Sequence, residues 1–218
     1  QSTLAMLGSG STMSVLIGAG GARLLLLDGT DPADFGNALK KESVPLLNRV
    51  DIVIVSNQEA GSTFVHTALD QVEYERLSVI GDSTGLLDAG VAVREQIRHS
   101  LEIRMPDQVS VMIQRGTDSG DDQPGWYATL SNGSIRILLT AGQPTTSMSS
   151  LTGPIAAWIQ IDDRMPDPEV LRSLVPRAIY VPAATVSGRE FAQRVPSEGG
   201  WDPLRFRVHA GDAIKLNL

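Results

Sequence analysis

A strand–crossover–strand unit near the start of the chain constrains the fold most. Leu24–Leu27 and Ile52–Val55 are uninterrupted aliphatic runs, as expected for buried strands. Between them, Asp31-Pro32 predicts a helix start, because Asp caps helices and Pro is favoured at the first helical position. In an α/β sheet, the loop after such a second strand lies at the carboxyl edge, where ligands bind. We therefore expect any chemistry of this chain at Ser56–Ser62.

The rest of the chain predicts many strands and few helices, in two similar halves that each place hairpins before helix-linked strands. Aliphatic runs without polar alternation indicate sheets covered on both faces, and Trp158 lies in such a run and is expected in the core. Asn132-Gly133 predicts a hairpin, and Leu204–His209 with Ala213–Leu218 predicts a last one. The expected helices are 32–41, 62–71, one opening at 167 and closing near 176, and 187–194. The expected strands are 11–17, 23–27, 51–55, 76–80, 91–96, 101–104, 108–115, 126–130, 134–140, 155–161, 178–181, 204–209 and 213–218.

The glycines at Gly18–Gly21 resemble part of a dinucleotide-binding fingerprint. That motif needs a helix directly after the glycines, since the pyrophosphate rests on the helix N-terminus. Here the aliphatic strand at Leu24–Leu27 follows instead. We interpret the glycines as a hairpin turn and keep nucleotide binding as a weaker alternative.

Composition narrows the function classes. The 218 residues are 42% hydrophobic and 20% charged, which is typical of a globular chain with a sizeable core. A net charge of −7 gives no general attraction to nucleic acid, which binds basic surfaces. The absence of cysteine excludes disulfides, thiolate metal sites and a cysteine nucleophile.

The chain does not predict direct insertion into a membrane, because it lacks an apolar run of about 20 residues. It begins at Gln1 without an initiator Met, and we expect it to be a processed piece of a longer protein. A membrane-attached segment before Gln1, or an unknown protein partner, is the expected associate.

Several stretches together resemble the metallo-β-lactamase fold, and most of all the soluble domain of ComEC-type DNA-uptake proteins. Leu26-Leu27-Asp28-Gly29 and Asp51–Val55 match the first two buried strands of that group, Ile137–Gly142 resembles its strand ending in Thr-Gly-Asp, and Pro168–Val181 resembles its late helix-strand unit. The resemblance implies an α/β fold with two mixed β-sheets sandwiched between helices (αββα), in a single domain over 1–218. It also favours an extracytoplasmic, membrane-attached setting.

The resemblance also implies where metal ligands would stand. The family motif HxHxDH follows the second strand directly, and its imidazoles and carboxylate bind two divalent cations that generate hydroxide at neutral pH. The histidines of this chain, His66, His99 and His209, stand elsewhere. Asp28 matches a family position that supports the loop and the fold. The degenerate site positions are Asp28, Ser56, Gln58, Glu59, Ala60, Gly61, Gln143 (or Gly142), Asp162 and Asp163.

The leading interpretation is a non-catalytic binding or scaffolding domain derived from a metallo-hydrolase, with no metal, cofactor or catalytic residue. A rival is a metal-dependent hydrolase of the phosphodiesterase or nuclease type, in which Asp28, Glu59, Asp162 and Asp163 form a carboxylate site for Mg²⁺, Mn²⁺ or Ca²⁺. These acids are also explained locally as strand-end and helix-cap residues. A serine hydrolase centred on Ser56 is weaker, since the G-x-S-x-G motif is absent.

Overall fold

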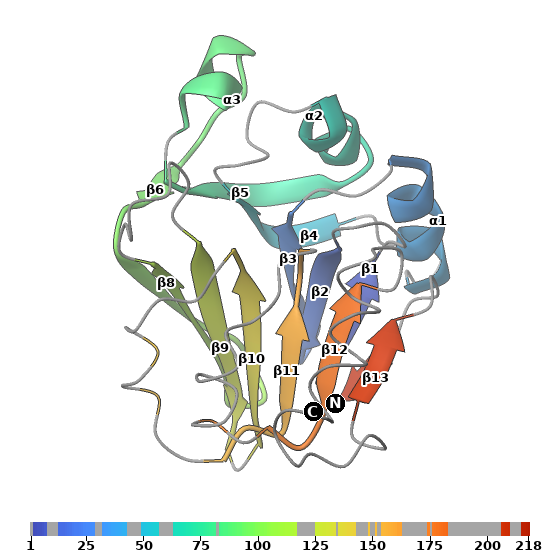
Figure 1. Cartoon of the computed structure of the whole chain (residues 1–218). Helices are drawn as coiled ribbons and strands as arrows, with labels where there is room; N and C mark the ends of the chain where they lie inside the picture. Colours follow the sequence, from blue (N-terminus) through green and yellow to red (C-terminus); the bar gives the residue numbers. More distant parts are fainter. Residues whose placement is uncertain are drawn as a thin grey trace. The chain divides into compact units, whose positions relative to one another are not determined.

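A computed structural model describes the chain in two compact units, each built around one mixed sheet (Figure 1). Unit 1 comprises Gln1–Arg98, Met105–Asp107 and Gly211–Leu218, and unit 2 comprises His99–Arg104 and Gln108–Ala210. The residues described are 2–7, 13–28, 32–42, 49–56, 63–81, 83–116, 125–133, 135–142, 148, 151, 154–162, 174, 176–182, 206–209 and 215–218. That the whole chain is a single domain stays a prediction.

Unit 1 contains one seven-stranded sheet in the order β14-β1-β2-β3-β4-β5-β6. β3, β4, β5 and β6 are parallel neighbours, while β14, β1, β2 and β3 pair antiparallel. Its elements are β1 (Thr3–Leu7), β2 (Ser14–Ala19), β3 (Ala22–Leu27), α1 (Pro32–Glu42), β4 (Arg49–Ser56), α2 (Thr63–Leu69), β5 (Glu73–Ile80), α3 (Thr84–Asp88), β6 (Glu95–Ile97) and β14 (Lys215–Asn217).

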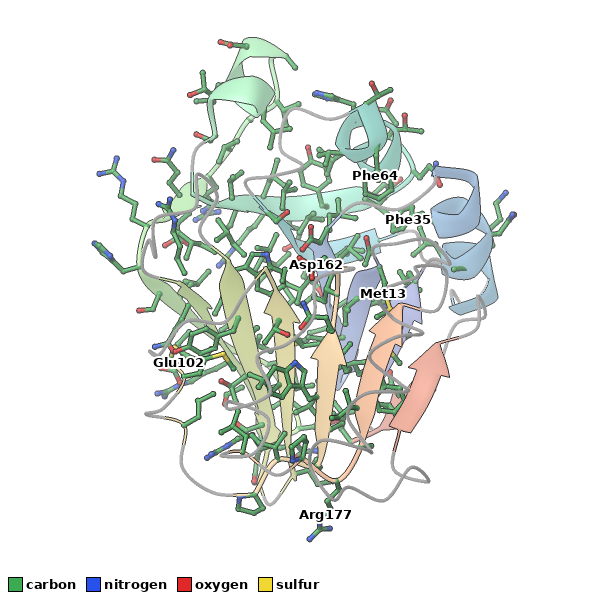
Figure 2. The ribbon with its side chains drawn as sticks, viewed as in Figure 1. Met13, Phe35, Phe64, Glu102, Asp162 and Arg177 are labelled. Atoms are coloured by element: carbon green, nitrogen blue, oxygen red, sulfur yellow. The ribbon has the colours of Figure 1, made fainter. Side chains whose placement is uncertain are left out.

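The core of unit 1 forms where α1 and α2 cover one face of its sheet. Alternate strand residues such as Leu25 and Val53 belong to one buried cluster with side chains of both helices. Phe35 of α1 and Phe64 of α2 meet edge to face, with ring centroids 5.8 Å apart (Figure 2). Aromatic pairs prefer this arrangement. Leu24, on the opposite face, is equally buried, so both faces of β3 are covered as predicted.

Unit 2 contains the other seven-stranded sheet, in the order β13-β12-β11-β10-β9-β8-β7. β7 to β10 form an antiparallel meander, and β10 to β13 are parallel neighbours. The strands are β7 (Ser100–Arg104), β8 (Val109–Arg115), β9 (Trp126–Asn132), β10 (Ile135–Ala141), β11 (Ala157–Gln160), β12 (Ile179–Pro182) and β13 (Phe206–His209). The hairpin predicted at Asn132-Gly133 is confirmed by the pairing of β9 with β10.

The glycine turn at Gly18–Gly21 is also confirmed. β2 and β3 pair antiparallel up to Ala19 opposite Ala22, and the turn residues Gly20 and Gly21 have φ values of 54° and 92°. Glycine adopts such left-handed conformations without strain. Since a strand and not a helix follows the glycines, the phosphate cradle of a dinucleotide site is not formed there.

Two predictions are wrong. The last two strands form no hairpin: β13 pairs parallel with β12 in unit 2, and β14 pairs antiparallel with β1 in unit 1. The strand expected at 91–96 is confined to β6, and the helix α3 precedes it. Val91 and Val93, which suggested a strand, instead pack half-buried against the core of unit 1.

The predicted helix 187–194 lies outside the described residues, as does nearly all of the one expected at 167–176. Among the helices that the structure describes, none is long and apolar enough to span a bilayer.

Candidate functional site

The carboxyl edge of β3 and β4 brings together two of the predicted site positions. Leu27 pairs with Val55 in the parallel register, so the next residues, Asp28 and Ser56, lie side by side at the strand ends. The Ser56 hydroxyl donates to Asp28 Oδ1 over 3.0 Å, and both residues are buried. A hydrogen bond to a buried carboxylate stabilises its charged form. This bond fits the supporting role that the resemblance assigns to Asp28.

The carboxyl edge of β10 and β11 holds the second group of site positions. Thr140 pairs with Gln160, which places Gly142 and Asp162 together just beyond the strand ends. The backbone N–H of Gly142 donates to Asp162 Oδ2 over 2.6 Å, and the Gln160 side-chain amide donates to Asp162 Oδ1. Asp162 is only 6% exposed (Figure 2). Both carboxylate oxygens therefore accept hydrogen bonds from neighbours in the same sheet.

This arrangement extends deeper into unit 2 as a chain of buried hydrogen bonds. The Thr140 hydroxyl donates to Gln160 Oε1 over 2.6 Å, and the indole N–H of Trp158 donates to Thr140 Oγ1 over 2.7 Å. Trp158, Thr140 and Gln160 are fully buried, which confirms the expected core position of Trp158. We call Gly142, Asp162, Gln160, Thr140 and Trp158 the β10–β11 network. Buried polar networks of this kind rigidify a structure when all members are satisfied.

The described site residues do not fit a two-metal centre of the type that the fold family implies. Ser56 carries a neutral hydroxyl and Gly142 has no side chain, whereas such centres use imidazole and carboxylate ligands. Within the part of the chain that the structure describes, no three or more His, Cys, Asp or Glu side chains are grouped so that they would hold a metal ion. The positions Gln58, Glu59, Ala60, Gly61, Gln143 and Asp163 lie outside that part.

The carboxylate cluster of the rival interpretation stays a prediction. Asp28 belongs to unit 1 and Asp162 to unit 2, and the structure describes each with partners of its own sheet. Ser56, the candidate nucleophile, donates to a carboxylate and not to a histidine. Its buried position leaves little room for attack on a substrate.

The three histidines belong to elements other than the strands β3, β4, β10 and β11 that carry the two strand-end groups. His66 is half-buried in α2, His99 is exposed between β6 and β7, and His209 ends β13 opposite Pro182. Two exposed arginines in other parts of the chain have raised pKa values. A hydrogen bond from Arg49 to Glu75, together with the charge attraction, raises the pKa of the Arg49 guanidinium, and Glu102 acts in the same way on the pKa of Arg104. Both arginines are fully charged at physiological pH.

Comparison with known proteins identifies the fold. No protein-family model matches the chain, and no curated protein matches it in sequence. YhfI from Bacillus subtilis, a metallo-β-lactamase fold protein, superposes with a TM-score of 0.65 over 99% of this chain and 100% of its own, at 8% identity. This chain has a metallo-β-lactamase-like α/β fold.

Two further solved structures agree with this fold. A diphosphatase of the PhnP family gives a TM-score of 0.59 at 13% identity, covering 100% of this chain and 98% of its own. A variant of the CmlA β-hydroxylase gives 0.62 at 14% identity, and this chain spans 54% of its length. At these identities the likeness extends to the fold alone.

Proposed function

We propose that this chain is a non-catalytic binding or scaffolding domain, built on a metallo-hydrolase fold whose metal ligands have been replaced. One observation carries the proposal. At each strand edge that the structure describes, the residues at site positions are hydrogen-bonded to each other within their own sheet: Ser56 to Asp28, and Gly142 to Asp162. The polar groups at these edges are engaged in holding the scaffold together.

The edge of unit 1 supports this view because of the direction of its hydrogen bond. Ser56 stands where the resemblance puts the first histidine ligand, and its proton points to Asp28. A neutral hydroxyl used as a donor to a buried carboxylate has little capacity left for a cation. The sequence adds Gln58, Ala60 and Gly61 at the other three positions of the motif, and none of them supplies an imidazole or a carboxylate.

The edge of unit 2 supports the proposal because other residue types stand where the family has its aspartate and its late histidine. Where the family has an aspartate after the Thr-Gly pair, this chain has Gly142 or Gln143, and where the family has the late histidine it has Asp162 or Asp163. The Asp162 carboxylate spans the distance between the two strand ends and accepts the backbone N–H of Gly142. A hydrogen bond thus joins the two strand ends at which the resemblance places metal ligands.

A domain of this kind keeps the loops that a rigid scaffold presents, and such loops commonly bind partners. We propose that its partner is a protein, or a membrane-attached segment before Gln1, in the extracytoplasmic setting that the ComEC-type resemblance implies. The net charge of −7 does not favour nucleic acid as the ligand.

The rival function is a metal-dependent hydrolase with an unusual carboxylate site. Two observations favour it: the diphosphatase named above shares the fold, and the carboxylates of Asp28 and Asp162 are both buried at strand edges. Oxygen-rich sites of this type bind Mg²⁺ or Mn²⁺.

Hydrolysis assays distinguish the two functions. The purified chain is incubated with a chromogenic phosphodiester, with diphosphate and with single-stranded DNA, each in the presence of Zn²⁺, Mn²⁺ or Mg²⁺. The proposal expects no turnover above the metal-only control. Turnover that disappears in an Asp162→Ala variant, and persists in a control variant of the exposed Asp88, would overturn it.

A further inference from the structure

Of the two outer strands that the structure describes in the sheet of unit 2, β7 offers a surface for self-association. Among the strands that the structure describes, β7 pairs only with β8 and ends the sheet. An edge strand presents backbone N–H and C=O groups that another strand can pair with. Glu102, in the middle of β7, is labelled in Figure 2.

The pairing of β7 with β8 decides which backbone groups face outward. The N–H of Arg115 donates to the C=O of His99 over 2.9 Å. Because hydrogen-bonded and non-hydrogen-bonded pairs alternate in an antiparallel ladder, Leu101 and Ile103 also direct their backbone groups to β8. Glu102 and Arg104 therefore direct theirs to the open side of the strand.

We propose that two copies of this chain associate by antiparallel pairing of their β7 strands about Ile103. In this register, Glu102 of one copy lies directly opposite Arg104 of the second copy, and the two residues exchange backbone hydrogen bonds. The same two-fold axis places Ile103 opposite Ile103, and the half-exposed Leu101 opposite the half-exposed Met105. One face of the interface between the two β7 strands thus pairs opposite charges, and the other face pairs apolar side chains.

The charges of β7 select this register over its neighbours. In an antiparallel pair of β7 strands, residues whose backbone groups face away from β8 must lie opposite one another. The two-fold axis must therefore pass through a residue, and neighbouring registers differ by one residue in the position of the axis. An axis at Glu102 or at Arg104 sets that residue opposite itself, and an axis at Leu101 sets Arg98 opposite Arg104. Like charges directly opposite one another destabilise a strand pair, whereas opposite charges stabilise it.

The two charged side chains are already available on the surface. Arg104 Nε donates to Glu102 Oε1 of the same strand over 2.9 Å, with the side chains 82% and 41% exposed. An exposed pair of this kind contributes little by itself. In the dimer, the carboxylate of each Glu102 would lie beside the Arg104 of its own strand and the Arg104 of the second copy. Pro106 has no N–H and ends the ladder, so we expect a short interface and a dimer that dissociates on dilution.

Sedimentation velocity of the full chain over a wide concentration range, at low ionic strength, tests the proposal. The expected result is a monomer–dimer equilibrium. Arg104→Glu and Glu102→Arg each place like charges opposite one another, and each should weaken the dimer about tenfold. The double variant with both changes restores opposite charges and should recover it. Arg49→Glu, which breaks an exposed Arg–Glu pair in unit 1, is the matched control and should dimerise like the wild type.

Three results would overturn the inference. A chain that stays monomeric at every concentration would show that β7 does not pair with a second copy. A dimer that resists both single reversals uses a different surface. Single reversals that weaken the dimer without recovery in the double variant would show that the two residues do not face each other. None of these results bears on metal binding, so the inference and the proposed function fail separately.

Discussion

The backbone N–H of Gly142 and the carboxylate of Asp162 are hydrogen-bonded over 2.6 Å, and this bond joins the carboxyl ends of β10 and β11. The family resemblance places one metal ligand at Gly142 or Gln143 and another at Asp162 or Asp163. The bond therefore connects the two strand ends directly, and it gives Asp162 a structural role at this edge of the sheet.

Replacing Asp162 by alanine tests that role. The change removes the side-chain acceptor of the buried Gly142 N–H and one of the two acceptors of the Gln160 amide, and we expect a loss of about 2–4 kcal/mol in the free energy of unfolding. Urea unfolding of the purified variant measures it. Asp88→Ala, at an exposed helix position, should change stability by less than about 0.5 kcal/mol. Equal stability of the two variants would contradict the structural role.

Ser56→Ala tests the edge of unit 1. The Asp28 carboxylate loses the hydroxyl donor at 3.0 Å, and we expect destabilisation of about 1–3 kcal/mol, since hydrogen bonds to charged groups exceed neutral ones. Ser100→Ala, at the exposed start of β7, serves as the control. If Ser56 were a metal ligand or a nucleophile, the variant would lose metal or activity while keeping its unfolding midpoint.

Gly20→Ala tests the turn between β2 and β3. A Cβ atom at Gly20 would overlap the Cβ of Pro106, and Gly20 has a φ of 54°. Gly133 has nearly the same φ, 56°, with no atom within 4 Å of its Cβ position. We expect Gly133→Ala to cost about 1 kcal/mol from the left-handed conformation alone, and Gly20→Ala to cost about 2–4 kcal/mol. Equal costs in thermal or urea unfolding would show that Pro106 moves away freely.

Local signals in the sequence predicted most of the fold correctly. The aliphatic runs at Leu24–Leu27 and Ile52–Val55 became β3 and β4, and Asp31-Pro32 preceded α1. These elements depend on periodicity and capping within a few residues, which a sequence displays directly. The metallo-β-lactamase-like fold was implied by the resemblance to that family, and the structural neighbours confirm the fold.

The last two strands show where local reasoning ends. A glycine turn between apolar runs predicts a hairpin. β13 and β14 instead complete the open edges at β12 and β1, which come from distant parts of the chain. The sequence near the turn carries no information about which sheet edges, formed by distant strands, are open for pairing.

The sequence did not predict the hydrogen bond at the edge of unit 2, again because that bond depends on pairing between strands that are distant in the chain. The hydrogen bond between Gly142 and Asp162 depends on the register of two parallel strands 20 residues apart in sequence, with Thr140 opposite Gln160. The sequence marked Asp162 as a candidate, but its partner could be found only once the register was known. A polar Thr140 and Gln160 inside otherwise aliphatic runs was the available signal, because buried polar side chains need partners.

The central claim is that the fold has lost its metal centre, and the metal content of the purified chain tests it most directly. The protein is incubated separately with Zn²⁺, Mn²⁺ and Mg²⁺, desalted, and analysed for bound metal by mass spectrometry, with Asp162→Ala in parallel. We predict no stoichiometric metal in either protein. One or two equivalents of tightly held metal in the wild type, reduced in Asp162→Ala, would contradict the account and identify the chain as a metallo-hydrolase.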